Sequence, residues 1–412
     1  MSSDVSTPSR LLGLARLMRL AFAGQDLAPL GERLLARARH HPEEAETLLD
    51  LSILLLLRGQ REEGLAMQDL AIRTRPLYRL PAVADPPGLR LLVILGPGDL
   101  MANTPLEFLL EDSDVELNLL YLLPGQPLPE AVPEHDALFV ALAESERSLP
   151  LLADLAAWLA DWPRPVLNRP ERIAHLSRDG VCALLQGAPG VVVPESVRVD
   201  RAGLLGLAAG TLPLESLLVG AACPLLIRPV DSHAGHDLAK LDSLDELGAY
   251  LAAAPGDAFY LAPFVDYRGR DGLFRKCRLV LVAGQPYVCH FAISAHWMIH
   301  YLNAGMAEDA AKRAEEARFM AEFDAGFARR HAAAFAAIHA RTGLDYVGID
   351  CAEAPGGELL VFEVDSCMIV HAMDPVDLFP YKQPQMRKVF GAFRSMLEAA
   401  RHASRAPIRD GA

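Results

Sequence analysis

The sequence has few cysteines, and no two of them stand at Cys-x-x-Cys spacing in a chain of 412 residues. This scarcity argues against a disulfide framework and against a zinc site, and it favours free thiols in a reducing compartment. The six cysteines are scattered from residue 182 onward: Cys182, Cys223, Cys277, Cys289, Cys351 and Cys367.

Basic residues are also in deficit, because 39 Lys and Arg stand against 53 Asp and Glu, for a formal net charge of -14. A nucleic-acid backbone needs a basic face, so we do not expect nucleic acid as the main partner. The overall sign does not exclude a nucleotide, since a few local arginines or lysines are enough to hold one triphosphate.

No long hydrophobic run is present. The most apolar stretch, Leu48–Leu57, is interrupted by Asp50 and Ser52 and is shorter than the roughly 20 residues of a membrane-spanning helix. The N-terminus lacks the charged start and continuous apolar run of a signal peptide. We therefore expect a soluble, cytoplasmic protein with no membrane partner.

The chain is long enough for two or three domains, and half of its residues are hydrophobic, so each domain can bury a core. Residues 10–80 show apolar positions at helical spacing without strand-type alternation. Pro42 and Pro76 lie 34 residues apart and bracket two expected helices, Ala45–Leu57 and Glu62–Arg73.

This helix pair resembles a tetratricopeptide repeat in its period and in its closing proline. Gly64 stands where such repeats often carry alanine, and Leu27–His40 fits the second helix of a partial repeat. Two roles stay open for residues 1–80: a concave surface that docks a peptide or protein, and a helical cap that packs against the next domain.

The proline-rich segment Pro81–Gly88 marks a domain boundary, and strands then alternate with helices over residues 88–170. Thr104 and Pro105 are expected to cap a helix, and Leu149–Leu159 is a second helix. Such alternation predicts a small parallel sheet covered on both faces. The expected strands are Arg90–Leu95, Leu117–Leu122, Ala137–Ala141 and Pro165–Asn168.

From residue 171 to residue 405 the pattern is mixed α+β. The expected helices are Ile173–Gln186, Ser243–Ala253, Asp309–Thr342 and Pro384–His402. The expected strands are Val191–Val193, Leu225–Arg228, Phe259–Leu261, Cys277–Val282, Tyr287–Ala292, Val347–Cys351 and Leu359–Val364.

The last two strands form a hairpin whose ends are acidic. Glu363 and Asp365 point to the same face, because side chains on a strand repeat every two residues, and Asp350 can lie alongside on the partner strand. Clustered carboxylates repel one another unless a cation neutralises them, and hard oxygen ligands suit Mg²⁺, with Mn²⁺ as a second candidate. The alternative is a surface hairpin with solvated acids, which explains poorly why the acids end apolar runs.

This hairpin resembles the metal-binding end of the ATP-grasp fold, whose last motif reads Glu-hydrophobic-Asn after an upstream Asp. Here Asp365 occupies the Asn position. The resemblance implies that Asp350, Glu363 and Asp365 are the metal ligands.

Preceding segments resemble further parts of the family in the same order. Arg178 and Arg228 match its two ATP-binding basic residues, which are usually lysines; arginine keeps the charge and grips phosphate in a bidentate manner. The segment 231–237 matches the loop over the phosphates, with Ser232, His233 and Gly235 as binding residues.

Phe259–Asp266 resembles the hinge that reads adenine, which implies nucleotide contacts from Ala262, Phe264, Val265 and Asp266. Residues 274–284 resemble the central strand that carries a catalytic basic residue. Arg278 fits that role, with Lys276 on the same face and Arg228 as a further catalytic group, because fixed positive charge stabilises developing negative charge.

The segment 290–305 lies near the acceptor substrate in that fold, and so does His371. Its polar and aromatic residues suit an acceptor pocket: Ser294, His296, Trp297, His300 and Asn303.

The resemblance implies an ATP-grasp enzyme of the glutathione synthetase-like type, with an α/β domain at 88–170 and two α+β subdomains at 171–405 that clamp ATP. Such an enzyme would use ATP and Mg²⁺ to convert a carboxylate into an acyl phosphate and couple it to an amine, releasing ADP. The alternatives are an enzyme that modifies a peptide or protein docked on residues 1–80, and a non-catalytic adaptor with a degenerate ATP-grasp body. The sequence is compatible with an oligomer.

Overall fold

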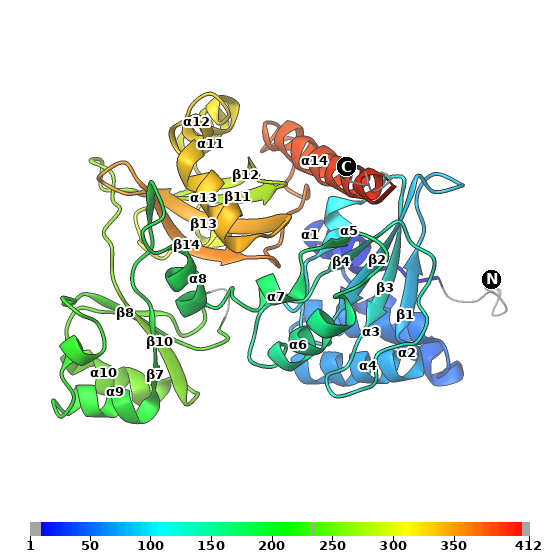
Figure 1. The fold of residues 1–412 in the computed structure, drawn as a ribbon, viewed down its shortest axis with the longest axis horizontal. Coiled ribbons are helices and arrows are strands. Elements are labelled where there is room, and N and C mark those ends of the chain that lie inside the picture. The colour runs from blue at the N-terminus through cyan, green and yellow to red at the C-terminus, as the bar shows by residue number, and fades with distance from the viewer. Residues whose placement is uncertain (1–9, 233–234, 406–412) are drawn as a thin grey trace, which may run out of the picture.

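The computed structural model describes residues 10–232 and 235–405. It contains three sheets and an N-terminal group of helices, arranged as lobes around a central sheet (Figure 1). The six cysteines are all free thiols, as predicted.

The N-terminal segment forms four helices, including the predicted pair. These are α1 (Leu14–Phe22), α2 (Ala28–His40), α3 (Ala45–Leu57) and α4 (Arg61–Thr74). The helical prediction is wrong at its end, where Leu77–Leu80 forms strand β1 and pairs antiparallel with the first sheet. Pro76 stops the helix before it, and Tyr78 is then buried against that sheet at 1% exposure.

The first sheet has the order β1-β3-β2-β4-β5, and all its neighbours except β1 run parallel. This confirms the small parallel sheet, with an added antiparallel edge. Its further elements are β2 (Leu89–Leu95), α5 (Leu106–Leu109), β3 (Val115–Tyr121), β4 (Ala137–Val140), α6 (Leu149–Trp158) and β5 (Val166–Leu167). Thr104 does not cap α5: its hydroxyl donates to the carbonyls of Ala141 and Ser366, which joins this sheet to the acidic hairpin.

The second sheet is small and antiparallel, with the order β7-β10-β8-β9, and it carries two helices on one side (Figure 1). The sequence did not predict β7, α9 or β9. Its elements are β7 (Val197–Asp200), α9 (Arg201–Ala208), η1 (Leu214–Ser216), β8 (Leu225–Pro229), β9 (Ala239–Leu241), η2 (Leu244–Glu246), α10 (Leu247–Ala253) and β10 (Ala258–Pro263).

The third sheet is central and has the order β12-β11-β13-β14-β6. Its predicted hairpin is present, because β13 and β14 pair antiparallel around a turn that contains Gly357 at φ 90°. The strands are β6 (Val191–Val192), β11 (Phe274–Val282), β12 (Gln285–Ser294), β13 (Tyr346–Glu353) and β14 (Leu359–Asp365).

Two expected helices are broken into pieces. The prediction over Ile173–Gln186 becomes α7 (Pro170–Ile173) and α8 (Arg178–Leu185), because the Ser177 hydroxyl accepts the amide of Gly180 and starts a new helix. The prediction over Asp309–Thr342 becomes three helices, since the backbone leaves helical geometry near Gly326. They are α11 (Ala310–Glu322), α12 (Phe327–Arg330) and α13 (Ala332–Thr342).

The last element of the described part is α14 (Lys382–Arg405), which packs against β11 and β12 of the central sheet and against β4 of the first sheet (Figure 1). The architecture is therefore the α+β arrangement that the sequence predicts, with an N-terminal helical region and three sheets. No helix within residues 10–232 and 235–405 is long and apolar enough to cross a lipid bilayer.

Candidate functional site

A row of polar residues crosses four neighbouring strands of the central sheet. Each residue lies directly opposite the next, so all four belong to the same face. The row runs from β12 to β14 as His290, Arg278, Asp350 and Glu363. An arginine and two acids side by side in a sheet are costly to bury unless they are neutralised by one another, by neighbouring groups or by a ligand.

The strand pairing is irregular at this row. The register shifts between Arg278 and Leu279 where β11 meets β12, and between Asp350 and Cys351 where β13 meets β14. Bulges re-aim side chains and are frequent next to functional sites. Both irregularities therefore mark the polar row as a specialised part of the sheet.

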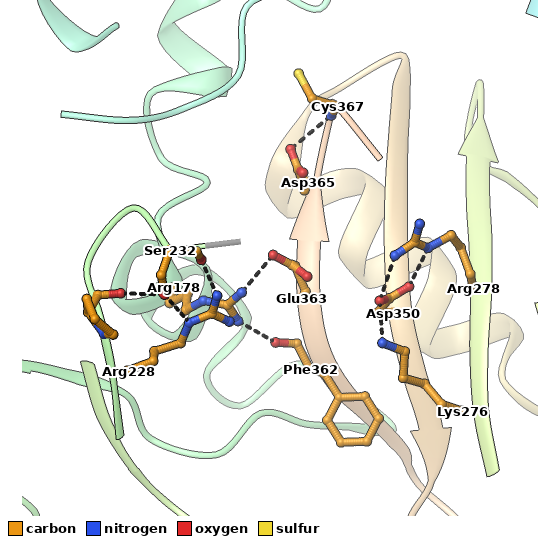
Figure 2. Close-up of polar contacts among 11 residues, drawn as sticks. Arg178, Arg228, Ser232, Lys276, Arg278, Asp350, Phe362, Glu363, Asp365 and Cys367 are labelled. Atoms are coloured by element: carbon orange, nitrogen blue, oxygen red, sulfur yellow. Dashed lines mark hydrogen bonds and ion pairs between the residues drawn. The ribbon is translucent and has the colours of Figure 1, made fainter. Parts of the chain in front are cut away.

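Asp350 lies between two cations of the neighbouring strand (Figure 2). Arg278 donates to it through Nε (2.8 Å) and Nη2 (3.0 Å), and Lys276 Nζ lies 2.8 Å from its Oδ2. Burial alone would raise the pKa of this carboxyl, whose side chain is 2% exposed, but the charges of Arg278 and Lys276 hold the pKa far below its ordinary value. Asp350 is thus ionised and fully paired.

Glu363 points the other way, toward α8 (Figure 2). Arg178 begins that helix and donates Nη2 to Glu363 Oε1 at 2.7 Å, while its Nη1 donates to the Phe362 carbonyl at 3.3 Å. Burial opposes ionisation of Glu363, but the charge of Arg178 keeps its pKa below the ordinary value. The predicted first basic residue therefore meets the predicted metal hairpin.

Asp365 is the third acid on this face, and the structure gives it no cationic partner among the described residues. Its carboxylate accepts the amide of Cys367 at 2.9 Å (Figure 2). Burial and then the negative charge of Glu363 raise the pKa of Asp365 to about 6. A cation bound here would relieve that repulsion.

Arg228 comes from β8 of the second sheet and is 8% exposed. Its Nε donates to the Ser232 hydroxyl at 2.9 Å, and its Nη2 contacts the Ser232 carbonyl (Figure 2). Burial and then the nearby charge of Arg178 lower the pKa of Arg228 to about 10, whereas Glu363 acts in the opposite direction. The two predicted phosphate-binding arginines are therefore neighbours, with Glu363 beside them.

The three predicted metal ligands do not form one cage. Among residues 10–232 and 235–405, no group of three or more His, Cys, Asp or Glu side chains is placed to hold a metal ion. Asp350 forms ion pairs with Arg278 and Lys276. Glu363 and Asp365 lie close enough for their negative charges to repel each other. The magnesium assignment stays a prediction.

The phosphate loop is described in part. Ser232 holds Arg228 and donates its own hydroxyl to the Pro229 carbonyl at 2.8 Å, so it fixes the start of the loop. Gly235 has φ 75°, a backbone conformation that residues other than glycine rarely adopt. His233 lies outside the described residues.

The predicted adenine hinge follows β10. Ala262, Phe264 and Val265 are half-buried, and the Phe264 ring lies 5.7 Å from that of Trp297. Lys240 of β9, which was not predicted as a site residue, also contacts Phe264: its Nζ lies over the Phe264 ring, 5.0 Å from the ring centroid.

Asp266, the last predicted hinge residue, is exposed and pairs with Arg268. The hydrogen bond from Arg268 lowers its pKa. Asp266 is therefore ionised at the mouth of the hinge, and any hydrogen bond to a ribose competes with Arg268.

In the predicted acceptor segment, residues 290–305, most of the polar groups form hydrogen bonds with neighbouring residues. The Ser294 hydroxyl accepts the His296 amide, the Asn303 side chain accepts the His300 amide, and the Trp297 carbonyl accepts the Tyr267 hydroxyl. Its link to the polar row is His300, whose pKa is lowered by burial and then by the charges of Lys276 and Arg278.

The sequence analysis missed Glu144, which follows β4 and lies near the acids of the site. Burial, and then the charges of Asp231, Asp179 and Asp365, raise the pKa of Glu144 to about 7. Lys382 and Glu316, which are 1% and 0% exposed and lie at the His290 end of the row, were not predicted either. Charged residues in helical segments are usually exposed, so no sequence pattern signals their burial.

Comparison with known proteins gives likenesses to solved structures at low sequence identity. No protein-family model and no curated protein sequence matches the chain. The VanG D-Ala:D-Ser ligase from Enterococcus faecalis is 15% identical, with 75% of this chain and 99% of that chain covered and a TM-score of 0.46. The D-alanine–D-alanine ligase from Bacillus anthracis, solved with ATP, is 12% identical, with 77% and 99% covered and a TM-score of 0.45.

A RimK domain ATP-grasp protein from Sphaerobacter thermophilus is 17% identical, with 75% of this chain and 99% of that chain covered and a TM-score of 0.40.

Proposed function

We propose that this protein is an ATP-dependent ligase that activates a carboxylate as an acyl phosphate and couples it to an amine, releasing ADP. The observation that carries the proposal is the meeting of Arg178 and Arg228, from two separate segments, beside Glu363 of the polar row. Arg228 is buried and Arg178 is half-buried beside it, so their like charges repel, and a bound anion would relieve that repulsion.

The pairing of the cations supports an anionic ligand. Arg178 pairs with Glu363, and Arg278 and Lys276 pair with Asp350. Arg228 is the remaining cation of this group, and among the described residues its hydrogen bonds go to the neutral Ser232. A triphosphate fits such a site, and arginine grips phosphate oxygens in a bidentate manner.

In the proposed reaction, a carboxylate oxygen of the substrate attacks the γ-phosphorus of ATP and the bond to the β–γ bridging oxygen breaks, giving an acyl phosphate and ADP. The amine nitrogen then attacks the acyl carbon, phosphate leaves, and the amine proton passes to water. Arg228 would neutralise the phosphates during the first step. Arg278, which Asp350 holds in a fixed orientation, would stabilise the negative charge of the acyl phosphate.

Glu363 and Asp365 suit Mg²⁺, because the ion is usually held by one or two carboxylates together with the phosphates of its nucleotide. Asp365 has no ion-pair partner in the described part of the chain, and burial and then the charge of Glu363 raise its pKa to about 6, so a bound cation would favour its ionised form. When bound, Mg²⁺ would supply charge neutralisation to the phosphates. Asp350 is paired with Arg278 and Lys276, so its proposed role is to orient them.

ADP release tests the proposal, measured with ATP, Mg²⁺ and a panel of carboxylates and amines. R228A is expected to lower the rate at limiting ATP by about a hundredfold, since it removes one phosphate-binding donor. The matched control is R330A, which removes an arginine from an exposed ion pair with Glu353 and is expected to leave the rate unchanged.

An equal loss of the ADP-release rate in both variants would contradict the assignment of Arg228 to the phosphate-binding site. Tight ATP binding without ADP release over the whole panel would instead favour the alternative of a non-catalytic adaptor.

A further inference from the structure

A buried polar cluster lies at the end of the row, beside Arg278, and the reaction proposed above does not use it. Lys382 opens α14 and is 1% exposed. Its ammonium lies 3.2 Å from Asp374 Oδ1, 3.7 Å from Glu316 Oε1 and next to the Tyr301 hydroxyl. Burial lowers the pKa of Lys382, but the charges of Glu316 and Asp374 oppose that shift and favour the ammonium form.

Lys382 determines the proton position on His290. Its Nζ lies 3.4 Å from His290 Nδ1, and an ammonium can only donate hydrogen bonds. Nδ1 must therefore be the acceptor, so the ring is neutral and carries its proton on Nε2. Burial and then the charge of Lys382 lower the pKa of His290, in agreement with a neutral ring.

His371 has the same tautomer for an independent reason. The backbone amide of Met373 donates to His371 Nδ1 at 3.2 Å, which leaves the proton on Nε2. Burial lowers the pKa of His371 as well. The two imidazole rings face each other edge to face with centroids 6.0 Å apart.

Neither Nε2–H group has a hydrogen-bond partner within residues 10–232 and 235–405. Arg278 lies directly opposite His290 in the sheet. Two N–H donors therefore lack an acceptor in this part of the chain, and they lie near the positive charge of Arg278, whose own hydrogen bonds go to Asp350 and the Ile369 carbonyl. Imidazole N–H groups donate to carboxylates, and a nearby positive charge favours an anion.

The N-terminal helix α1 contributes an apolar side chain next to these two histidines. Phe22, the last residue of α1, lies 5.0 Å from the His371 ring, and its side chain is 47% exposed. Further along α1, Met18 packs with Phe108 against Ile369 and Met373 of the loop that carries His371. The helix is thus fixed to the loop, and its exposed phenylalanine stands at the site.

We propose that His290 and His371 bind a substrate carboxylate through their Nε2–H groups, and that Phe22 contacts an apolar group of the same substrate. This inference rests on the proposed function, because it assigns a binding site to one substrate of that reaction. Lys382 is a positioning residue that fixes the His290 tautomer. The N-terminal helix then takes part in substrate selection rather than serving only as a cap.

The test is an NMR titration of the full chain labelled with ¹⁵N in its histidine rings, using 3-phenylpropionate and its amide as probes. Both rings are expected in the neutral Nε2–H form, and the carboxylate should shift their signals saturably while the amide does not. A proton on Nδ1 in the free protein, or equal shifts with both probes, would overturn the proposal.

Variants separate the roles of the residues. F22A is expected to weaken 3-phenylpropionate binding at least about fivefold with little effect on acetate, since it removes only an apolar contact. H371L should abolish the ring-specific response of His290, whereas H371Q, which keeps a donor near the Nε2 position, should retain part of it. The control H402A alters an exposed histidine of α14 and should change nothing.

The outcome is distinguishable from that of the proposed function, because ATP binding is measured separately with the same samples. Binding of ATP without a histidine response to any carboxylate would overturn this inference alone. A histidine response without ATP binding would overturn the ligase alone. If ADP is released with the carboxylate before any amine is added, the bound carboxylate is the one that becomes phosphorylated; otherwise it belongs to the acceptor.

Discussion

Arg278 and Asp350 stand opposite each other on β11 and β13, and one guanidinium gives two hydrogen bonds to one carboxylate, at 2.8 and 3.0 Å. This pair (Figure 2) is the centre of the polar row, with His290 on one side and Glu363 on the other. Because the carboxylate is buried, the pair fixes where the positive charge of Arg278 lies. A fixed charge stabilises a reacting phosphate without having to reorganise.

We predict that D350N destabilises the protein by roughly 3 kcal/mol, because it leaves Arg278 and Lys276 largely buried without their counter-ion. Urea unfolding measures the effect. The control is E353Q, which breaks an exposed pair with Arg330 and should cost less than about 1 kcal/mol. Similar losses of stability in the two variants would show that the ion pairs of Asp350 contribute no more to stability than an exposed pair does.

We predict that D365N keeps the Mg²⁺ concentration for half-maximal activity within about threefold of the wild type, whereas E363Q raises it more than about tenfold. Asparagine keeps an oxygen ligand and removes the repulsion that raises the pKa of Asp365. Glutamine at position 363 removes the charge that both Arg178 and a metal ion would use. Loss of activity in D365N would show that the second negative charge is required.

The pairing of Asp350 with Glu363 could be predicted from the sequence, because it depends on local rules. A glycine-containing turn joins two strands, and a period of two places alternate side chains on one face. The same rules place Arg278 and Lys276 on one face. The structure confirms this register, although it adds bulges that no sequence pattern shows.

The charge partners could not be predicted in the same way. Arg178 meets Glu363 across 185 residues of chain, and Lys382 meets His290 across 92. Such contacts depend on how the lobes pack, which local periodicity does not encode. The break before Arg178 was missed for a related reason: the Ser177 cap overrides a continuous helical pattern.

We predict that the stability difference between E107Q and the wild type depends on pH. Glu107 of α5 accepts the amide of Ala15 in α1 at 3.0 Å, and burial raises its pKa to about 7. The folded state therefore keeps a proton that the unfolded state loses between about pH 4.5 and 7, so the contribution of Glu107 to stability falls as the pH rises through that window.

Glutamine does not titrate and keeps the accepting oxygen. When the pH rises from 5 to 8, the free energy of unfolding of E107Q should therefore increase relative to that of the wild type by up to roughly 3 kcal/mol. Chemical denaturation at both pH values measures the change. A difference that stays constant would mean that the carboxyl is ionised throughout, held by the amides of α1.

We predict that G64A destabilises the protein by about 1–3 kcal/mol, although alanine normally favours a helix by about 1 kcal/mol over glycine. Gly64 of α4 is buried against α3, and an added Cβ would lie 2.8 Å from Cγ of Leu56. The matched control is G391A in α14, where an added Cβ meets nothing within 4 Å and should stabilise by about 0.5–1 kcal/mol. Thermal unfolding measures both variants. If G64A were as stabilising as G391A, α3 and α4 would have to separate easily, and the helix pair would not be the close-packed hairpin seen here.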